Sequence, residues 1–321
     1  MRRLLFLKLC IIFSGIAAVF LYSHAQKVVY TPHKVSEEMF VQIDNGMSLQ
    51  KIAKMLREHK LIEHNYEFIL YVKFNKLYPK FKAGEYLINN DISIAGLADL
   101  FSGGKAHLRK LTIPEGLTSR EAMEIILNNE YLDGDFTPFK EGEILPETYT
   151  FTRNEMRQKL VNQAKEALSK VLQQAWAERD ADLPLKNKEE MLVLASIVEK
   201  ETGIAEERPQ VASVFINRLR KNMLLQTDPT VIYAITKGET DLNRPLLRKD
   251  LEIDSPYNTY KYEGLPPAPI CNPGKDAIMA VAHPDKTPYL YFVASGTGGH
   301  NFAKTLEEHN QNVRKWKAIT K

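Results

Sequence analysis

The sequence predicts an α+β protein made of an N-terminal membrane anchor, a small α+β module and a larger mixed α+β domain. Three observations support this prediction. An apolar run opens the chain, short strand-like segments followed by capped helices come next, and amphipathic helices then alternate with polar loops. The boundaries that we expect are 1–25 for the anchor, 26–37 for a polar spacer, 38–106 for the module and 107–321 for the larger domain. A chain of 321 residues with 44% hydrophobic and 26% charged residues is long enough for two domains.

The anchor is predicted from the first 25 residues. Arg2 and Arg3 precede an apolar run from Leu4 to Tyr22, which is close to the ~20 residues that cross a bilayer. Arginines before the run favour an N-terminus inside the cell. The sequence therefore predicts a single-pass protein of the cytoplasmic (inner) membrane, with the rest of the chain on the periplasmic or extracytoplasmic side. A cleaved signal peptide, with Ser23–Ala25 as its small-x-small site, is the alternative that the sequence leaves open.

Charge and motif content exclude several function classes. The 43 basic and 40 acidic residues give a net charge of +3, and no long basic run is present, so we expect no nucleic-acid partner. The eight histidines lack metal-binding spacing, and the two cysteines form no Cys-x-x-Cys pair. We therefore expect neither a metal nor a cofactor.

The module is predicted from a repeated local pattern of a short strand, a turn, a Ser or Thr N-cap and an amphipathic helix. The three strand segments are Val41–Ile43, Tyr86–Ile88 and Leu111–Ile113, and the matching caps are Ser48, Ser93 and Thr118. This pattern resembles a LysM-like module, a small sugar-binding fold. A plain α+β packing domain fits the pattern equally well.

The chemistry is expected on a helix over 189–203. Met191 to Val198 is almost entirely apolar, and Glu199 follows directly. Apolar surroundings and the helix C-terminus both disfavour the charged form of a carboxylate. A carboxylic acid that stays protonated near neutral pH is what general-acid cleavage of a glycosidic bond requires. A Glu paired with Lys or Arg at a helix end is the alternative.

Glu201 lies two residues further along this helix and therefore points to roughly the opposite side from Glu199. The two do not form the facing carboxylate pair of an ordinary glycosidase. We expect Glu201 to cap, pair or orient. Three later loops, 226–230, 257–260 and 298–302, carry the amides, hydroxyls and rings that suit sugars.

From Met191 to His309 the chain resembles the endolytic murein transglycosylases of the MltG (YceG-like) family. The segments that carry the resemblance are Ala195–Thr202, Val211–Leu219, Leu225–Tyr233, Tyr257–Tyr260, Gly264–Pro267, Ala282–Pro284, Thr287–Ala294 and Gly298–His300. A weaker match extends back through Leu145–Tyr149 and the LysM-like part.

The resemblance implies that Glu199 is the catalytic residue. It would protonate the glycosidic oxygen between N-acetylmuramic acid and N-acetylglucosamine and then accept the proton of the muramic C6 hydroxyl, which leaves a 1,6-anhydro end. The family acts on nascent glycan strands and terminates them during wall synthesis. Substrate contacts are expected from three residues first, Gln226, Asn258 and Tyr260, and then from Asp228, Glu201 and His300.

Two other functions stay open. A hydrolytic muramidase fits if Asp228 activates water across the cleft. A non-catalytic, wall-binding division scaffold fits the anchor and the LysM-like part. The expected partners are peptidoglycan glycan strands, the membrane and, from the resemblance, the wall-synthesis machinery.

Overall fold

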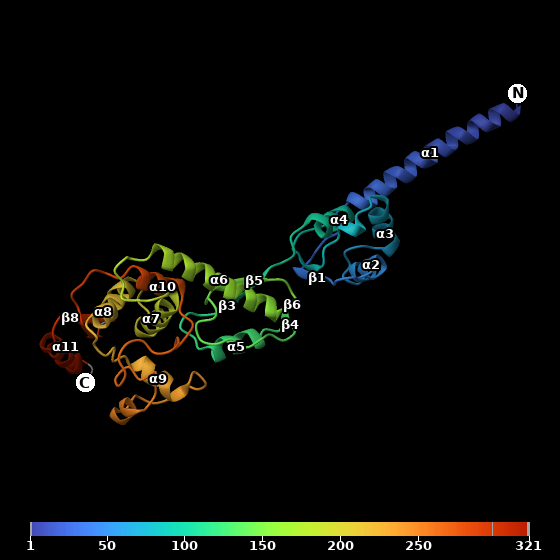
Figure 1. The fold of residues 1–321 in the computed structure, drawn as a ribbon. Helices are drawn as coiled ribbons and strands as arrows, with labels where there is room; N and C mark the ends of the chain where they lie inside the picture. The colour runs from blue at the N-terminus through green and yellow to red at the C-terminus, as the bar shows by residue number, and fades with distance from the viewer. Residues whose placement is uncertain (1, 297, 320–321) are drawn as a thin grey trace. The chain divides into compact units, whose positions relative to one another are not determined.

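The computed structural model describes residues 2–296 and 298–319. The chain is α+β, as predicted, and divides into two compact units, unit 1 over Met1–Arg109 and unit 2 over Lys110–Lys321 (Figure 1). Each unit has its own buried core.

Unit 1 packs three short helices on a two-stranded antiparallel sheet. Its elements are α1 (Arg2–Tyr30), β1 (Met39–Ile43), α2 (Leu49–Glu58), α3 (Asn65–Phe74), the 3-10 turn η1 (Tyr78–Lys80), β2 (Gly84–Ile88) and α4 (Ile94–Gly103). Val41 of β1 lies opposite Tyr86 of β2, and both side chains are buried. The predicted caps are confirmed, since the hydroxyls of Ser48 and Ser93 accept backbone N–H groups at 3.3 and 3.1 Å.

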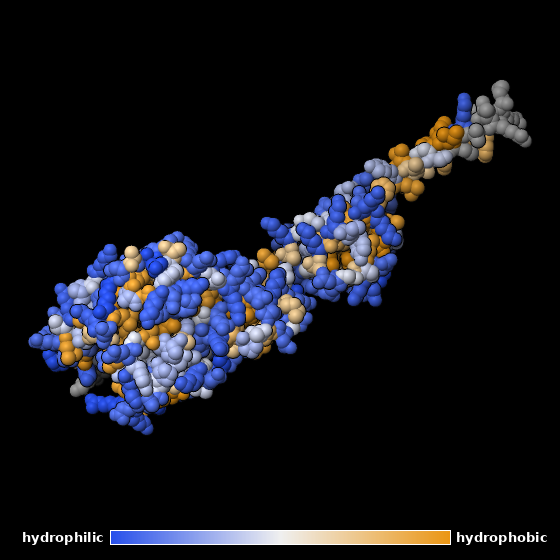
Figure 2. All heavy atoms as spheres, in the orientation of Figure 1, coloured by the Kyte–Doolittle hydropathy of each residue, from blue (hydrophilic) through white to orange (hydrophobic). Residues whose placement is uncertain are grey.

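Helix α1 is the one described segment that is long and apolar enough to cross a membrane, over Ile11–Tyr30. Its apolar side chains over 11–22 are exposed, as Figure 2 shows. Its last turn contacts the core of unit 1, because Val28 packs against that cluster.

Unit 2 is mostly helical, with three small two-stranded sheets. Its helices are α5 (Ser119–Leu127), α6 (Arg157–Glu178), α7 (Lys188–Glu201), α8 (Arg208–Arg220), α9 (Asp228–Thr236), α10 (Lys275–Ala282) and α11 (Leu306–Ile319), with 3-10 turns η2 (Ala205–Glu207) and η3 (Arg248–Glu252). The strands are β3 (Arg109–Thr112), β4 (Leu132–Asp133), β5 (Thr148–Phe151), β6 (Glu155–Met156), β7 (Tyr291–Ala294) and β8 (His300–Ala303), paired β3–β5, β4–β6 and β7–β8.

Helix α7 lies at the centre of unit 2 and packs against α6, α8, α9 and α10 (Figure 1). All eight residues from Met191 to Val198 are buried, as the apolar run predicted. The predicted end of the helix at Gly203 is wrong. Helix α7 ends at Glu201, because Thr202 turns into an extended conformation.

Candidate functional site

The site is built around the end of α7, where Glu199 and Glu201 leave the buried run. The side chain of Asn187 caps the start of α7 by accepting the N–H of Glu190 at 2.8 Å. The helix is therefore fixed at both its cap and its buried face. Two residues correspond to about 200° of helical rotation, so the two carboxylates enter different surroundings.

Glu199 enters a charged cluster. Its side chain is 5% exposed, and its Oε1 lies 3.5 Å from Nη2 of Arg208, whose side chain is 8% exposed. The N–H of Gly274, which precedes α10, donates to its Oε2 at 2.9 Å. A cation and a backbone donor therefore each contact one oxygen of this carboxylate. The expected apolar pocket around Glu199 is therefore corrected to an ion pair at a helix end, the alternative that the sequence left open.

Two more carboxylates share Arg208 with Glu199. Oε2 of Glu115 lies 3.5 Å from the same Nη2, and Oδ2 of Asp276 lies 3.9 Å from Nη1. Burial raises the pKa of Glu115, and the charge of Glu199 raises it further, while Arg208 lowers it. Glu115 also explains the glycine at position 274, since a Cβ there would lie 1.9 Å from its Oε1.

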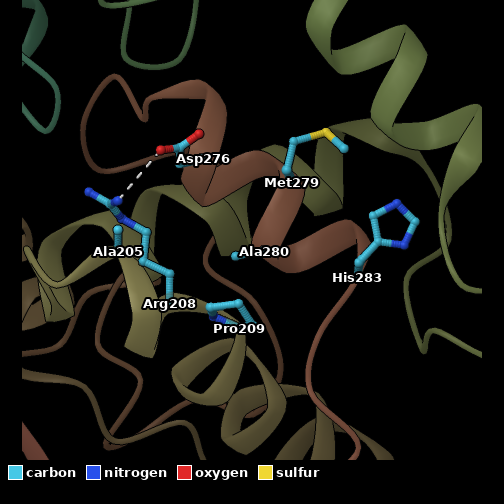
Figure 3. A pocket seen from close by; sticks show the side chains of 7 residues that line it. All are labelled: Ala205, Arg208, Pro209, Asp276, Met279, Ala280 and His283. Carbon is cyan, nitrogen blue, oxygen red and sulfur yellow. Dashed lines mark ion pairs between the residues drawn. The ribbon is translucent and has the colours of Figure 1, made fainter.

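A cavity of about 280 Å³ opens beside this cluster (Figure 3). It is lined by Ala205, Arg208, Pro209, Asp276, Met279, Ala280 and His283. Figure 3 shows the guanidinium of Arg208 directed toward Asp276 on α10 at one side of the cavity, with His283 at the far end of α10. Arg208 is therefore both a wall of this cavity and the partner of Glu199.

Glu201 has different surroundings. The Thr227 hydroxyl donates a hydrogen bond to its Oε1. Burial raises the pKa of Glu201, the Thr227 bond partly lowers it, the charge of Asp228 raises it, and His300 and Arg218 lower it. Burial is the largest of these effects, so this carboxyl retains its proton to higher pH than an ordinary Glu. A carboxyl shifted by burial and specific neighbours is a candidate acid.

Several residues expected to contact the substrate gather beside Glu201. The Tyr260 hydroxyl donates to Oδ1 of Asp228 at 2.5 Å, and burial and this bond raise the pKa of Tyr260. The loop 226–230 is tied to this segment, because the N–H groups of Gln226 and Thr227 donate to the carbonyl and hydroxyl of Thr259, each at 3.1 Å. Gln226 has a positive φ of 48°, an uncommon conformation for a residue other than glycine. Gln226 and Asp228 are exposed, so they form an accessible rim.

His300 joins this group through Glu207. Nδ1 of His300 lies 2.8 Å from Oε2 of Glu207, and the His300 N–H donates to Oε1 at 2.9 Å. The preceding Gly299 has a φ of +80°, and a Cβ there would lie 2.3 Å from the same Oε1. The glycine-rich loop 298–302 therefore fixes a histidine whose charge acts on Glu201.

Asn258 does not join the rim. Its side chain is 0% exposed, and its amide donates to the carbonyls of Leu251 and Ile253 at 2.9 and 2.8 Å. Its Oδ1 accepts the N–H of Tyr260 at 3.0 Å. The expected substrate contact is corrected to a structural role, in which Asn258 shapes the loop that carries Tyr260.

Replacement of Asn258 by Ala is expected to lower the free energy of unfolding of unit 2 by about 3 kcal/mol, because it leaves buried backbone groups without partners. Urea unfolding followed by tryptophan fluorescence measures this, since both tryptophans, Trp176 and Trp316, lie in unit 2. The exposed Asn162→Ala on α6 is the control, with a change within about 0.5 kcal/mol. If Asn258→Ala left stability unchanged but weakened glycan binding, the result would support a direct contact between Asn258 and the substrate.

A third carboxyl with a raised pKa lies in unit 2. Burial raises the pKa of Glu141 to about 7, although the Ser119 N–H donates to its Oε2 at 2.7 Å. Gly238 packs close to its Oε1, where a Cβ would lie at 2.7 Å. Glu141 therefore belongs in any test of which carboxyl acts as an acid.

Sequence reasoning missed the partners of both helix-end carboxylates. These residues are Glu115, Arg208, Gly274 and Asp276 beside Glu199, and Thr227 and Glu207 near Glu201. The one local signal is Pro114-Glu115-Gly116, an acidic residue held in a turn. Among residues 2–296 and 298–319, no three His, Cys, Asp or Glu side chains are placed to hold a metal ion jointly.

Comparisons with a family model, with relatives in sequence and with a solved structure all point to the same family. The model of the YceG-like family matches residues 41–315. The chain is 34% identical over 311 residues to an endolytic murein transglycosylase of Bacillus subtilis (strain 168), which covers 86% of this chain and 84% of the relative. It is 31% identical over 323 residues to a protein of the same name from Streptococcus pneumoniae serotype 2, but spans only 57% of that longer chain. A crystal structure of a YceG-like protein from Listeria monocytogenes matches 86% of this chain and 99% of its own, with 31% identity and a TM-score of 0.54.

Proposed function

Because the chain belongs to the YceG-like family, we propose that it is an endolytic murein transglycosylase, the activity for which its relatives are named. Its substrate is the glycan of peptidoglycan, cut within nascent strands between N-acetylmuramic acid and N-acetylglucosamine. The cut ends a strand during wall synthesis. The observation that carries this proposal is the Glu201 carboxyl at the end of α7, bonded by the Thr227 hydroxyl beside the exposed rim of Gln226 and Asp228.

We assign the acid/base role to Glu201, with Glu199 as the competing candidate. A general acid must hold a proton near neutral pH. Burial raises the pKa of Glu201. Both oxygens of Glu199, by contrast, already have partners in Arg208 and the Gly274 N–H. Most of the expected substrate contacts also lie around Glu201.

The reaction follows from one carboxyl that acts twice. Glu201 donates its proton to the bridging oxygen as the bond from that oxygen to muramic C1 breaks. The resulting carboxylate accepts the proton of the C6 hydroxyl, and that oxygen bonds to C1, so the product is a 1,6-anhydro end and no water is consumed. Gln226 and Tyr260 are proposed to contact the sugars, and the Glu207–His300 pair to position charge beside Glu201.

Hydrolysis remains a second candidate because Asp228 is close enough to Glu201 for its charge to raise the pKa of that group. In that case Asp228 would activate a water molecule. Asp228 accepts the Tyr260 hydrogen bond at Oδ1, so its other oxygen is the one that would bind this water.

We further propose that α1 anchors the chain in the cytoplasmic membrane with unit 2 on the outer side. The arginines before the apolar run support this orientation. Residues 38–106 are proposed to act as a LysM-like glycan-binding module, and 107–321 as the catalytic domain. Contact with the wall-synthesis machinery is proposed from the family.

Mass spectrometry of the products from un-crosslinked glycan strands tests the function, with the full chain in a non-ionic detergent. We expect anhydro-muramic ends, which are lighter than reducing ends by one water molecule. Reducing ends would indicate hydrolysis and point to Asp228. Binding of strands without cleavage would favour a non-catalytic scaffold.

A further inference from the structure

Helix α3 of unit 1 carries an exposed apolar stripe. Tyr66, Leu70 and Phe74 follow one another at four-residue spacing, so they lie along one face. They are 59%, 63% and 89% exposed, while Phe68 and Val72 on the other face are fully buried. A row of large apolar side chains in water marks an interaction surface.

The stripe lies beside the end of the membrane-crossing helix. The candidate span ends at Tyr30, whose ring packs edge-on against that of Tyr71 on α3, with 6.4 Å between ring centroids. Figure 1 shows α3 and α4 at the side of unit 1 from which α1 emerges, and both helices contact α1. Tyr71 therefore lies beside the last residue of the candidate span, and tyrosines are enriched at the boundary between hydrocarbon and headgroups.

Positive charge accompanies the stripe. The segment 68–84 contains four lysines and no acidic residue. These lysines are Lys73, Lys76, Lys80 and Lys82, and all are exposed. Lysines near a membrane surface are each attracted to anionic lipids by about 1 kcal/mol. Apolar side chains on a helix, with lysines at its end and directly after it, are typical of a segment that lies in the membrane interface.

We propose that α3 lies on the outer surface of the membrane that α1 crosses. Tyr66, Leu70 and Phe74 insert among the lipid headgroups, and the lysines contact anionic phosphates. This contact, which rests on the proposed anchoring by α1, fixes which side of unit 1 faces the bilayer. A site for a protein partner is the alternative that the test must separate.

Quenching of tryptophan by brominated lipids tests this with the full chain in vesicles of phosphatidylglycerol and brominated phosphatidylcholine. Phe74→Trp reports on the stripe, and Phe13→Trp on α1 is the positive control for insertion. Phe40→Trp, an exposed position on β1, is the matched negative control. The parent chain gives the background of Trp176 and Trp316.

Phe74→Trp and Phe13→Trp are each expected to lose roughly half of their added fluorescence relative to vesicles without bromine, and Phe40→Trp none. Adding Lys73→Glu and Lys76→Glu to Phe74→Trp is expected to weaken the quenching. Quenching of Phe13→Trp alone would overturn the proposal and favour a protein partner for the stripe. Quenching of neither would overturn the anchor as well. Glycan cleavage is assayed separately, so failure of the membrane contact leaves the enzymatic proposal intact.

Discussion

Replacement of Glu201 by Gln is expected to lower glycan cleavage by about 10²- to 10⁴-fold, the usual contribution of general acid–base catalysis. Gln keeps the size of the side chain and its contact with Thr227 but carries no transferable acidic proton. The loss is expected in kcat, because the rim formed by Gln226 and Asp228 still binds the strand. Release of anhydro-muramic ends over time, at saturating strand concentration, measures this.

Two matched controls separate Glu201 from the other acidic candidates. Glu199→Gln and Glu141→Gln make the same substitution elsewhere in unit 2, and each is expected to reduce cleavage about tenfold or less. Unfolding in urea shows whether each variant is folded. Full loss of cleavage in a folded Glu199→Gln, with Glu201→Gln still active, would return the acid/base role to Glu199.

The raised pKa of Glu201 also predicts the pH profile of the parent enzyme. Burial raises the folded pKa of this carboxyl above that of a free Glu, so the protonated acid persists at pH values where an ordinary Glu is ionised. Cleavage is therefore expected to persist into that range and to fall as the pH rises through the raised pKa. A decline that begins already at the pKa of a free Glu would contradict the assignment.

Local sequence patterns predicted the elements well. The N-caps Ser48, Ser93 and Thr118 each accept a backbone N–H at the start of a helix, as expected from residue type and position. The buried run of α7 was equally clear, because seven of its eight residues from Met191 to Val198 are apolar and such a run is rarely found at a surface. These features depend on neighbours in sequence.

The partners of Glu199 and Glu201 could not be predicted in the same way. Helical periodicity separates Glu199 from Glu201, but it does not say which neighbour each carboxylate meets. Arg208 arrives from the next helix and Glu115 from a turn 84 residues earlier in the chain, and only tertiary packing brings them to Glu199. The predicted substrate contact of Asn258 was wrong for a related reason. An Asn in a polar loop looks available to a sugar until its amide is found bonded to two buried carbonyls.

Replacement of Arg208 by Met is expected to lower the free energy of unfolding of unit 2 by about 3 kcal/mol. The change leaves Glu199 buried without its cation, and breaking a buried pair by removal of one partner typically costs 3–5 kcal/mol. The lower end applies because the contacts of 3.5 Å are longer than an ideal charged hydrogen bond and because the Gly274 N–H remains. Arg220→Met, on the last residue of the same helix, is the control. Arg220 pairs with Asp182 at 2.8 Å on the surface, so a change within about 1 kcal/mol is expected.

A double-mutant cycle of Arg208→Met and Glu199→Gln tests whether the Arg208–Glu199 ion pair stabilises the fold. If Arg208 and Glu199 form a structural ion pair, the double variant is expected to be more stable than the sum of the two single changes implies, by at least about 1 kcal/mol. Tryptophan fluorescence in urea gives all four free energies, because both tryptophans report on unit 2. A coupling near zero would mean that Glu199 does not depend on Arg208 for its stability in the folded chain. The Gly274 N–H would then be the partner that holds Glu199, and the case for Glu201 would lose one of its supports.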